Sequence, residues 1–466
     1  MGGLLSLLQQ GSQSLTAQRG AMQTASHNLE NAATPGYARQ RADIQAAVAG
    51  QLGSAGYLGQ GALLGSVTQV RDRYLESQIP AAAGASARSA AESTALMSIS
   101  ALNPSAAGGL TDALGTFYAN LRALSQSPGD GSLRASAVEG ARGLSASFRS
   151  TTASLEAARS GLDQQLTGNV SEVNQLAQSF AQYNRDITTA QSAGGEASDL
   201  LDQRLKIQDR LVELTGAHPI QSSNGEVTLA LANGASLVTG NSASTLSLQA
   251  DPANGGHLAL FISAPGATRA AIGTASVSGA IGGALSARDV TIGSAVSSVD
   301  QLAFDLAASV NAVHKTGFAS DGSTGRDLLE VGPTAAGAAS RMAVQSEVDA
   351  DPRLFAAGSS AAASDGRTLL ALIGTETAPL ASGTSPDGAL ANITSAFGLG
   401  ASRAKALAEH DASLHENLLS LRESASGVSI DEETISMLKA QRAFEAVSKV
   451  ITATNSLLDT LMKIGS

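Results

Sequence analysis

Near the C-terminus, apolar and small side chains recur at alternating spacings of three and four residues. This first row comprises Met437, Ala440, Phe444, Val447, Ile451, Thr454, Leu458 and Leu461. A second row beside it comprises Ala443, Ala446, Val450, Ala453, Leu457 and Ile464. Such spacing is typical of a helix that packs lengthwise on a neighbour, and it predicts a helix from Ser429 to Lys463. Two adjoining rows form a face too wide for one partner helix, although an ordinary core-facing helix would show the same pattern.

The predicted start of this helix carries two further signals. Ser429 to Glu432 fits a capping box, in which the serine oxygen caps a free backbone N–H and Glu432 reaches back. Asp431, Glu432 and Glu433 also place negative charge at the positive end of the helix dipole.

The N-terminal residues Gly2 to Ala33 predict a second helix of this kind. Its row has the same alternating spacing, with two weak positions: Leu8, Gly11, Leu15, Gln18, Met22, Ala25 and Leu29. Pro35 and Gly36 then end the helix, because proline disfavours helix in the residue before it and glycine readily takes a positive φ. The turn separates the N-terminal helix from the rest of the chain.

Pairing the two terminal helices would cover only one of the C-terminal rows. Since burying a Leu, Ile or Phe side chain is worth roughly 1.5–3 kcal/mol, the second row predicts contacts with other subunits, and termini that order on assembly. The predicted interface residues are Leu8, Leu15, Met22, Leu29, Pro35, Gly36, Tyr37, Met437, Phe444, Val447, Val450, Ile451, Leu457, Leu458, Leu461 and Ile464.

The middle of the chain predicts a mainly α fold with an inserted β domain. Residues 40–80 look extended, residues 82–214 look helical, and a long apolar row from Ala141 to Ile187 suggests a rod-like helix. Asn233-Gly234 between two apolar runs predicts a hairpin. A helix is expected at 293–315 and another at 402–423, with few elements at 317–400. The expected domains are 1–40 with 426–466 (coiled-coil assembly), 41–215 with 287–425 (elongated helical) and 216–286 (β-rich).

Composition narrows the function classes. The net charge of −11 and the lack of a basic cluster argue against nucleic acid as a partner. The sequence has no cysteine, which excludes disulfides and thiol chemistry. No run of 18 apolar residues occurs, so membrane insertion is not expected. The first residues lack a basic segment and a long apolar segment, so no cleaved signal peptide is expected.

The sequence points to no catalytic, cofactor-binding or metal site. His410 and His415 are five residues apart and would not share a helix face as metal ligands. His314 is expected at a helix end, where a cation favours the dipole and a capping role is preferred. The zinc-protease, phosphate-loop and nucleophile-elbow motifs are missing. A hydrolase with paired carboxylates in the β insert stays open, although no residue points to it.

Several segments resemble a known family. "TASHNLENAATPGYARQR" (Thr24 to Arg41) is similar to the N-terminal signature of the axial proteins of the bacterial flagellum; His27 and Ala33 stand where many members carry Asn. Four further segments resemble the family of flagellar hook-associated protein 1, in the right order: 56–78, 200–216, 306–332 and 426–464. The resemblance weakens at 217–290 and 333–425.

The resemblance implies a structural role without catalysis. The family's paired terminal helices form the inner tube of a hollow helical assembly, surrounded by a helical domain with a β-rich domain outermost. Members polymerise on the hook tip as the first junction protein and link hook to filament, outside the cell. The implied partners are further copies in an axial ring or helix, the hook protein, the second junction protein, an export chaperone on the C-terminal helix and the type III export apparatus. Another axial protein, such as a hook or filament subunit, and a cytosolic coiled-coil adaptor remain the alternatives.

Overall fold

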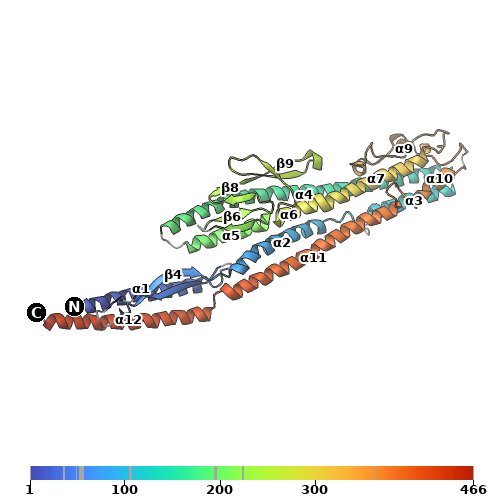
Figure 1. The fold of residues 1–466 in the computed structure, drawn as a ribbon. Coiled ribbons are helices and arrows are strands. Elements are labelled where there is room, and N and C mark those ends of the chain that lie inside the picture. Colours follow the sequence, from blue (N-terminus) through green and yellow to red (C-terminus); the bar gives the residue numbers. More distant parts are fainter. Residues whose placement is uncertain are drawn as a thin grey trace.

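The molecule is elongated, with both chain ends at the same tip (Figure 1). The computed structural model describes residues 2–464 except 35–36, 49, 52–56, 104–107, 194–196, 223–224 and 363. Helix α1 (Gly2–Glu30) and helix α12 (Ile430–Ile464) form a slender unit, which we call the tail. Beyond the tail, α2 (Arg73–Met97) lies along α11 (Pro386–Ser426). The remaining long helices form the body: α3 (Leu110–Gln126), α4 (Gly131–Ser192), α5 (Ser198–Thr215) and α7 (Gly293–His314).

The tail also contains an antiparallel pair of strands that packs on α1. Strand β1 (Gln40–Ala46) pairs with β4 (Ala62–Gln69), and the register shifts at a bulge between Asp43 and Ile44. Between them, the short strands β2 (Gly50–Gln51) and β3 (Tyr57–Leu58) also pair.

Two small antiparallel sheets lie against α4 (Figure 1). The first contains β5 (His218–Gln221), β6 (Val227–Ala230), β7 (Ser236–Thr239) and β8 (Ser242–Ala243). The second contains β9 (Thr245–Ala250), β10 (Leu258–Ser263) and β11 (Ala270–Ile272), with the short helix η2 (Pro252–Asn254) before β10. The predicted hairpin at Asn233-Gly234 is confirmed: Gly234 has a φ of +82°, and the Leu231 N–H donates to the Ala235 carbonyl over 2.8 Å.

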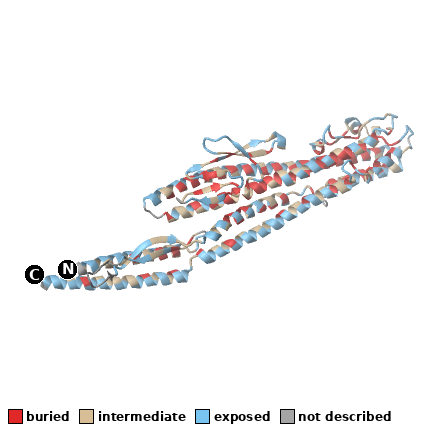
Figure 2. Ribbon diagram, viewed as in Figure 1, coloured by how far each residue is buried: buried red, intermediate tan, exposed pale blue. Residues whose placement is uncertain are grey.

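The body buries its apolar side chains along α4, whereas the tail is mostly exposed or half-buried (Figure 2). The rod-like helix predicted from Ala141 to Ile187 is confirmed and runs without a break through Gly161 and Gly168. Its buried row includes Ala141, Leu144, Phe148, Leu155, Leu162, Val170, Val173, Ala177, Phe180 and Ile187. No helix among the residues described is both long and apolar enough to cross a bilayer.

The mainly α fold with an inserted β region is confirmed, but three boundaries differ from the predictions. Helix α2 begins at Arg73, inside the stretch expected to be extended, because the Asp72 carboxylate accepts the Tyr74 N–H over 2.8 Å as a cap. Helix α11 begins at Pro386 rather than at Ser402, because the Ser385 hydroxyl caps it and proline suits the first turn. The end of the predicted β domain is helical: α6 (Gly279–Leu285) is followed by the π-helical segment η3 (Ser286–Ile292).

The stretch 317–400, for which few elements were expected, contains several short ones. They are β12 (Leu329–Glu330), α8 (Ala338–Arg341), β13 (Ala343–Val344), α9 (Ser346–Ala350), η4 (Pro352–Leu354) and α10 (Arg367–Gly374). The division into three domains stays a prediction.

Candidate assembly interface of the tail

Helices α1 and α12 run antiparallel and pack along the first row of α12. Gly11 of α1 lies so close to α12 that a Cβ there would be 2.7 Å from Cγ1 of Ile451. Ala440 and Thr454 of the first row are buried, and Met437, Phe444, Val447, Ile451 and Leu458 are half-buried. From α1, Gly11 and Ala25 are buried and Leu8, Leu15, Met22 and Leu29 are half-buried. The two predicted rows therefore meet within one chain.

The second row of α12 remains largely uncovered. Val450 is 55% exposed and Leu457 is 57% exposed, and Ala446 and Ala453 are also exposed. Leu461 was assigned to the first row, yet it is 50% exposed. The tail thus presents a continuous apolar stripe that the chain itself does not bury, which is typical of a docking surface.

The opposite side of α1 is covered by strand β4. The Ala62 N–H donates to the Ser14 hydroxyl over 3.2 Å. A Cβ at Gly20 would be 2.7 Å from Cδ2 of Leu64, so this glycine permits the close approach of the strand. Near its start, α1 leaves Leu5 and Leu7 exposed.

A buried polar network joins the two ends of the chain around Asn28. The Asn28 side-chain amide donates to the Glu433 carboxylate over 3.0 Å and to the Gln40 carbonyl over 2.7 Å. Its oxygen accepts from the Tyr37 hydroxyl (2.7 Å) and from the Gln40 N–H (2.9 Å). Asn28 is fully buried, and each of its polar atoms has a partner, so the network fixes the chain on both sides of the turn.

Arg39 completes this network, and its contacts show that the predicted capping box is only half formed. Its guanidinium donates to Glu433 over 2.6 Å and to Glu432 over 2.7 Å. The Glu432 carboxylate therefore binds Arg39, while the Ser429 hydroxyl accepts the Glu432 N–H over 3.4 Å. Burial lowers the pKa of Arg39, but the two carboxylates outweigh it, and the net effect raises the pKa. Burial, with Asp202 and Glu433 nearby, also raises the pKa of Tyr37, which keeps its hydroxyl a neutral donor.

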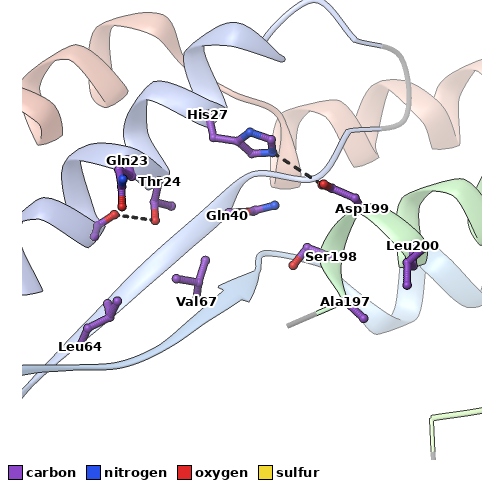
Figure 3. Close-up of a pocket in the computed structure, with 11 residues that line it drawn as sticks. Gln23, Thr24, His27, Gln40, Leu64, Val67, Ala197, Ser198, Asp199 and Leu200 are labelled. Carbon is purple, nitrogen blue, oxygen red and sulfur yellow. Dashed lines mark hydrogen bonds and ion pairs between the residues drawn. The ribbon is translucent and has the colours of Figure 1, made fainter. Parts of the chain in front are cut away.

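The tail meets the body beside an open cavity of about 600 Å³ (Figure 3). His27 of α1 lies 3.9 Å from Asp199 at the start of α5, across the rim of this cavity. Close by, Arg71 pairs with Asp202 of α5 over 2.9 Å, and Gln69 donates to the same carboxylate over 3.0 Å. Burial raises the pKa of Asp202. These polar contacts join the tail to the body, and the cavity is lined by residues of the tail and by the start of α5.

Three of the predicted interface residues cannot be placed fully. Pro35 and Gly36 lie outside the described residues, as does the side chain of Ile464. Tyr37 is half-buried in the Asn28 network. The rows came from helical periodicity, which does not report polar contacts, so Asn28 and Arg39 were not singled out, and Glu433 was noted only for its negative charge at the start of the last helix. An arginine just after the turn, facing acidic residues at the start of the last helix, was the available signal.

Two histidines of the body are buried, and one of them differs from expectation. His314 is buried at the end of α7, where its Nε2 accepts the Ala356 N–H over 3.0 Å and its Nδ1 faces the Arg326 carbonyl at 2.9 Å. An accepting ring nitrogen means a neutral ring, so the predicted cation at the helix end is wrong; burial lowers the pKa of His314. His257, which the sequence did not single out, is buried among charged groups. Across the described part of the chain, no three His, Asp or Glu residues are grouped as a metal site would require.

Comparisons with known proteins agree with this architecture. Residues 98–329 match the family described as flagellar hook-associated protein FlgK helical domain, and residues 422–464 match the C-terminal family of the flagellar basal body rod proteins FlgEFG. The solved flagellar hook junction protein FlgK from Burkholderia pseudomallei has the same fold, with a TM-score of 0.68 at 18% identity over 75% of this chain and 100% of that chain.

Curated relatives extend the similarity over nearly the whole sequence. Flagellar hook-associated protein 1 of Bacillus subtilis is 26% identical over 98% of this chain and 97% of its own length. The protein of that name from Salmonella typhimurium is 27% identical over 70% of this chain, and the match spans 60% of the relative's length. The helical-domain match, the relatives and the shared fold agree with one another, and together they support the family of flagellar hook-associated protein 1 as the family of this chain.

Proposed function

We propose that this chain is a structural, non-enzymatic subunit of the bacterial flagellum. It polymerises on the hook tip outside the cell and links hook to filament. The observation that carries the proposal is the uncovered second row of α12, with Val450 and Leu457 more than half exposed on a helix whose first row is already occupied by α1. The names of the similar proteins, hook-associated protein and hook junction protein, support the location.

Neighbouring copies of the chain are the occupants that this stripe fits best. Each buried Val or Leu side chain contributes roughly 1.5–3 kcal/mol, and a repeating axial contact would bury the stripe in every subunit. The tail would then line an inner tube, with the helical body around it and the sheets β5–β11 outermost. Subunits held in this way form a ring or a helix.

The same stripe would also contribute to contacts with the other proposed partners. The hook protein and the second junction protein would contact the two ends of the assembly, and the match of residues 422–464 to rod proteins supports contacts among axial proteins of this kind. Before assembly, a chaperone would cover the apolar face of α12, and the chain would leave through the type III export apparatus. Coverage of the stripe before assembly prevents aggregation.

Substitutions in the second row test the proposal without disturbing the α1–α12 pair. Val450→Asp and Leu457→Asp place a charge on the exposed stripe, so the subunit should fold yet fail to add to hooks purified from a strain that lacks it. Ser456→Asp is the matched control, since it adds the same charge at an exposed position outside both rows. Binding is read by co-sedimentation with hooks and by electron microscopy.

A truncation provides the second arm of this test. Removal of Ile435–Ser466 should leave a soluble, folded body that does not add to hooks. A strain carrying only this form should make hooks without filaments and release flagellin into the medium. Normal hook binding by the truncated protein, or by both Val450→Asp and Leu457→Asp, would refute the proposed role of the stripe.

A further inference from the structure

A second cavity, of about 630 Å³, lies where α2 and α5 meet strands β5 and β6, and we call it the arginine cavity. Arg71 and Arg73 line it at the start of α2, and Arg204 lines it from α5. The carboxylate of its wall is that of Glu76. A concave wall with more guanidinium groups than carboxylates stands out in a chain whose net charge is −11.

Arg71 already has its counter-charges. Its guanidinium lies 2.9 Å from the Asp202 carboxylate and 3.6 Å from that of Glu76. Arg73 is exposed and makes no ion pair with any residue that the structure describes. The carboxylates beside the cavity are therefore used by Arg71, and Arg73 and Arg204 are left for a ligand.

Arg204 is a buried cation without a counter-charge. The residue is 6% exposed, and its Nη1 donates to the Asn184 side-chain oxygen and to the Gly225 carbonyl, each over 2.9 Å. Both acceptors are neutral, and no carboxylate of the described part of the chain lies within ion-pair distance. Burial and the nearby charge of Arg71 lower the pKa of Arg204 to about 10. A buried charge that is not paired in this way is costly.

One edge of the Arg204 guanidinium remains available. The hydrogen bonds of Arg204 come from Nη1, and within the described residues neither Nε nor Nη2 has an acceptor. The N–H groups of Nε and Nη2 lie side by side and match the two oxygens of a carboxylate. Because Arg204 lines the cavity, a ligand inside it can accept from this edge.

The rest of the wall indicates what else the ligand carries. The volume falls within the range of roughly 300–1,000 Å³ that is usual for small-molecule sites. Apolar and uncharged polar side chains share the remaining wall, so a carboxylate on a short apolar stem fits it better than a bare inorganic anion. These side chains are Ser77, Pro80, Leu201, Leu205, Gln208, Pro219, Gln221 and Val227.

We propose that the arginine cavity binds a ligand that bears a carboxylate on a short apolar stem. Arg204 forms the two-pronged pair with the carboxylate, and Arg73 adds a second positive charge at the exposed side of the cavity. A free small carboxylic acid and an acidic side chain of a neighbouring copy share this chemistry.

Binding of glutarate to the full-length chain tests the site, with the uncharged glutaramide as its matched control. Calorimetry measures affinity, and NMR of the arginine Nε–H groups reports contact with the guanidinium. Glutarate should bind and glutaramide should not, and added salt should weaken binding. Arg204→Gln should weaken it about tenfold or more, because a hydrogen-bonded buried charge is lost. Arg73→Gln removes an exposed charge and should cost at most about fivefold.

Two further variants control for folding and for charge. Arg204 also donates to Asn184 and Gly225, so Arg204→Lys is included: it keeps the positive charge but cannot form the two-pronged pair, and its affinity should be intermediate. Arg88→Gln changes an exposed arginine of α2 outside the cavity and should bind as the wild type does. Binding of glutarate no tighter than that of glutaramide, or unchanged binding in both Arg204→Lys and Arg73→Gln, would overturn the proposal.

Addition of subunits to purified hooks distinguishes the two sources of the carboxylate. If a neighbouring copy supplies it, glutarate and Arg73→Gln should both reduce addition, whereas Arg88→Gln should not. If the ligand is a free molecule, addition should be unchanged while glutarate still binds. Failure of the wild-type chain itself to add to hooks would contradict the proposed function and would leave the glutarate result as the test of this site.

Discussion

Asn28 in the first helix donates to the buried carboxylate of Glu433 in the last helix over 3.0 Å, although 405 positions separate the two residues in the chain. The same carboxylate accepts from Arg39, just after the turn that ends α1. The N-terminal segment that resembles flagellar axial proteins therefore serves as the partner of the start of α12. Apolar packing and polar contacts therefore join the two ends of the chain within a single subunit.

Glu433→Gln should loosen the tail while the body keeps its stability. The amide that replaces the carboxylate has one acceptor for the donors of Asn28 and Arg39, so a buried donor loses its partner, at a cost of about 1–3 kcal/mol. Hydrogen exchange should become faster in α1 and α12. Glu432→Gln is the control, because its side chain is 63% exposed and an exposed pair with Arg39 is worth about 0–1 kcal/mol. Equal effects of the two substitutions would contradict a special role for the buried contacts of Glu433 with Asn28 and Arg39.

Gly11→Ala should weaken the α1–α12 pair, although alanine is the better helix former by about 1 kcal/mol. The new methyl group would lie 2.7 Å from Cγ1 and 2.9 Å from Cδ1 of Ile451, so the Ile451 side chain or the two helices must shift. Gly168→Ala on α4 is the control, because its Cβ would meet nothing within 4 Å, and it should stabilise the protein. Adding Ile451→Ala should partly restore the pair in a double-mutant cycle. A gain in stability at both glycines would show that the close approach is unimportant.

His314 should make the protein less stable as the pH falls. Burial lowers its pKa in the folded state, so the unfolded chain binds the proton more readily below about pH 6.5. The stabilising contribution is complete above that pH and is lost as the pH falls towards the folded-state pKa. Thermal unfolding measured across this range should show a smaller acid-induced decrease in His314→Gln, whose absolute stability is lower. An unchanged acid dependence in this variant would argue against a neutral buried ring.

Asp209→Asn should stabilise the protein at neutral pH. Burial, opposed by Arg422 and aided by Glu76 and Glu213, raises the pKa of Asp209 to about 6. Above that pH the folded state holds a charge that it disfavours by about 3 kcal/mol, at about 1.4 kcal/mol for each unit of pKa.

The advantage of Asp209→Asn should shrink as the pH falls from about 6 to about 4, because the wild-type carboxyl then takes a proton in the folded state. Melting temperatures across this range provide the measurement. Glu416→Gln, at an exposed position on α11, should give no comparable gain. A gain that does not vary with pH would point to helix propensity rather than to the buried charge.

The elements that sequence predicted well are those whose pattern repeats. The buried row from Ala141 to Ile187 and the paired rows of the terminal helices depend only on helical periodicity, which any lengthwise packing partner imposes. The Asn233-Gly234 hairpin depends on a local backbone preference. Boundaries were less certain: α11 begins sixteen residues before the predicted start, because a single Ser–Pro cap at residues 385–386 can extend a weakly patterned helix.

The contacts that the sequence did not predict follow no repeating pattern of residues. The loop before β10 brings His257 against Asp163 and Glu156, and the paired tail helices bring Asn28 against Glu433. These contacts join residues that lie far apart in the sequence. The charged state of a histidine likewise follows from its partners and not from its place in the sequence. His314 was expected as a helix-end cation and is instead a buried neutral acceptor.

The sequence alone determined the helices, their apolar rows and the excess of apolar surface on α12, because these follow from side-chain spacing along one element. Only the tertiary structure decided which row is covered and which is left open, since covering depends on where α1 and β4 lie. It also decided where charge is buried, because desolvation depends on neighbours that the chain brings together only when it folds.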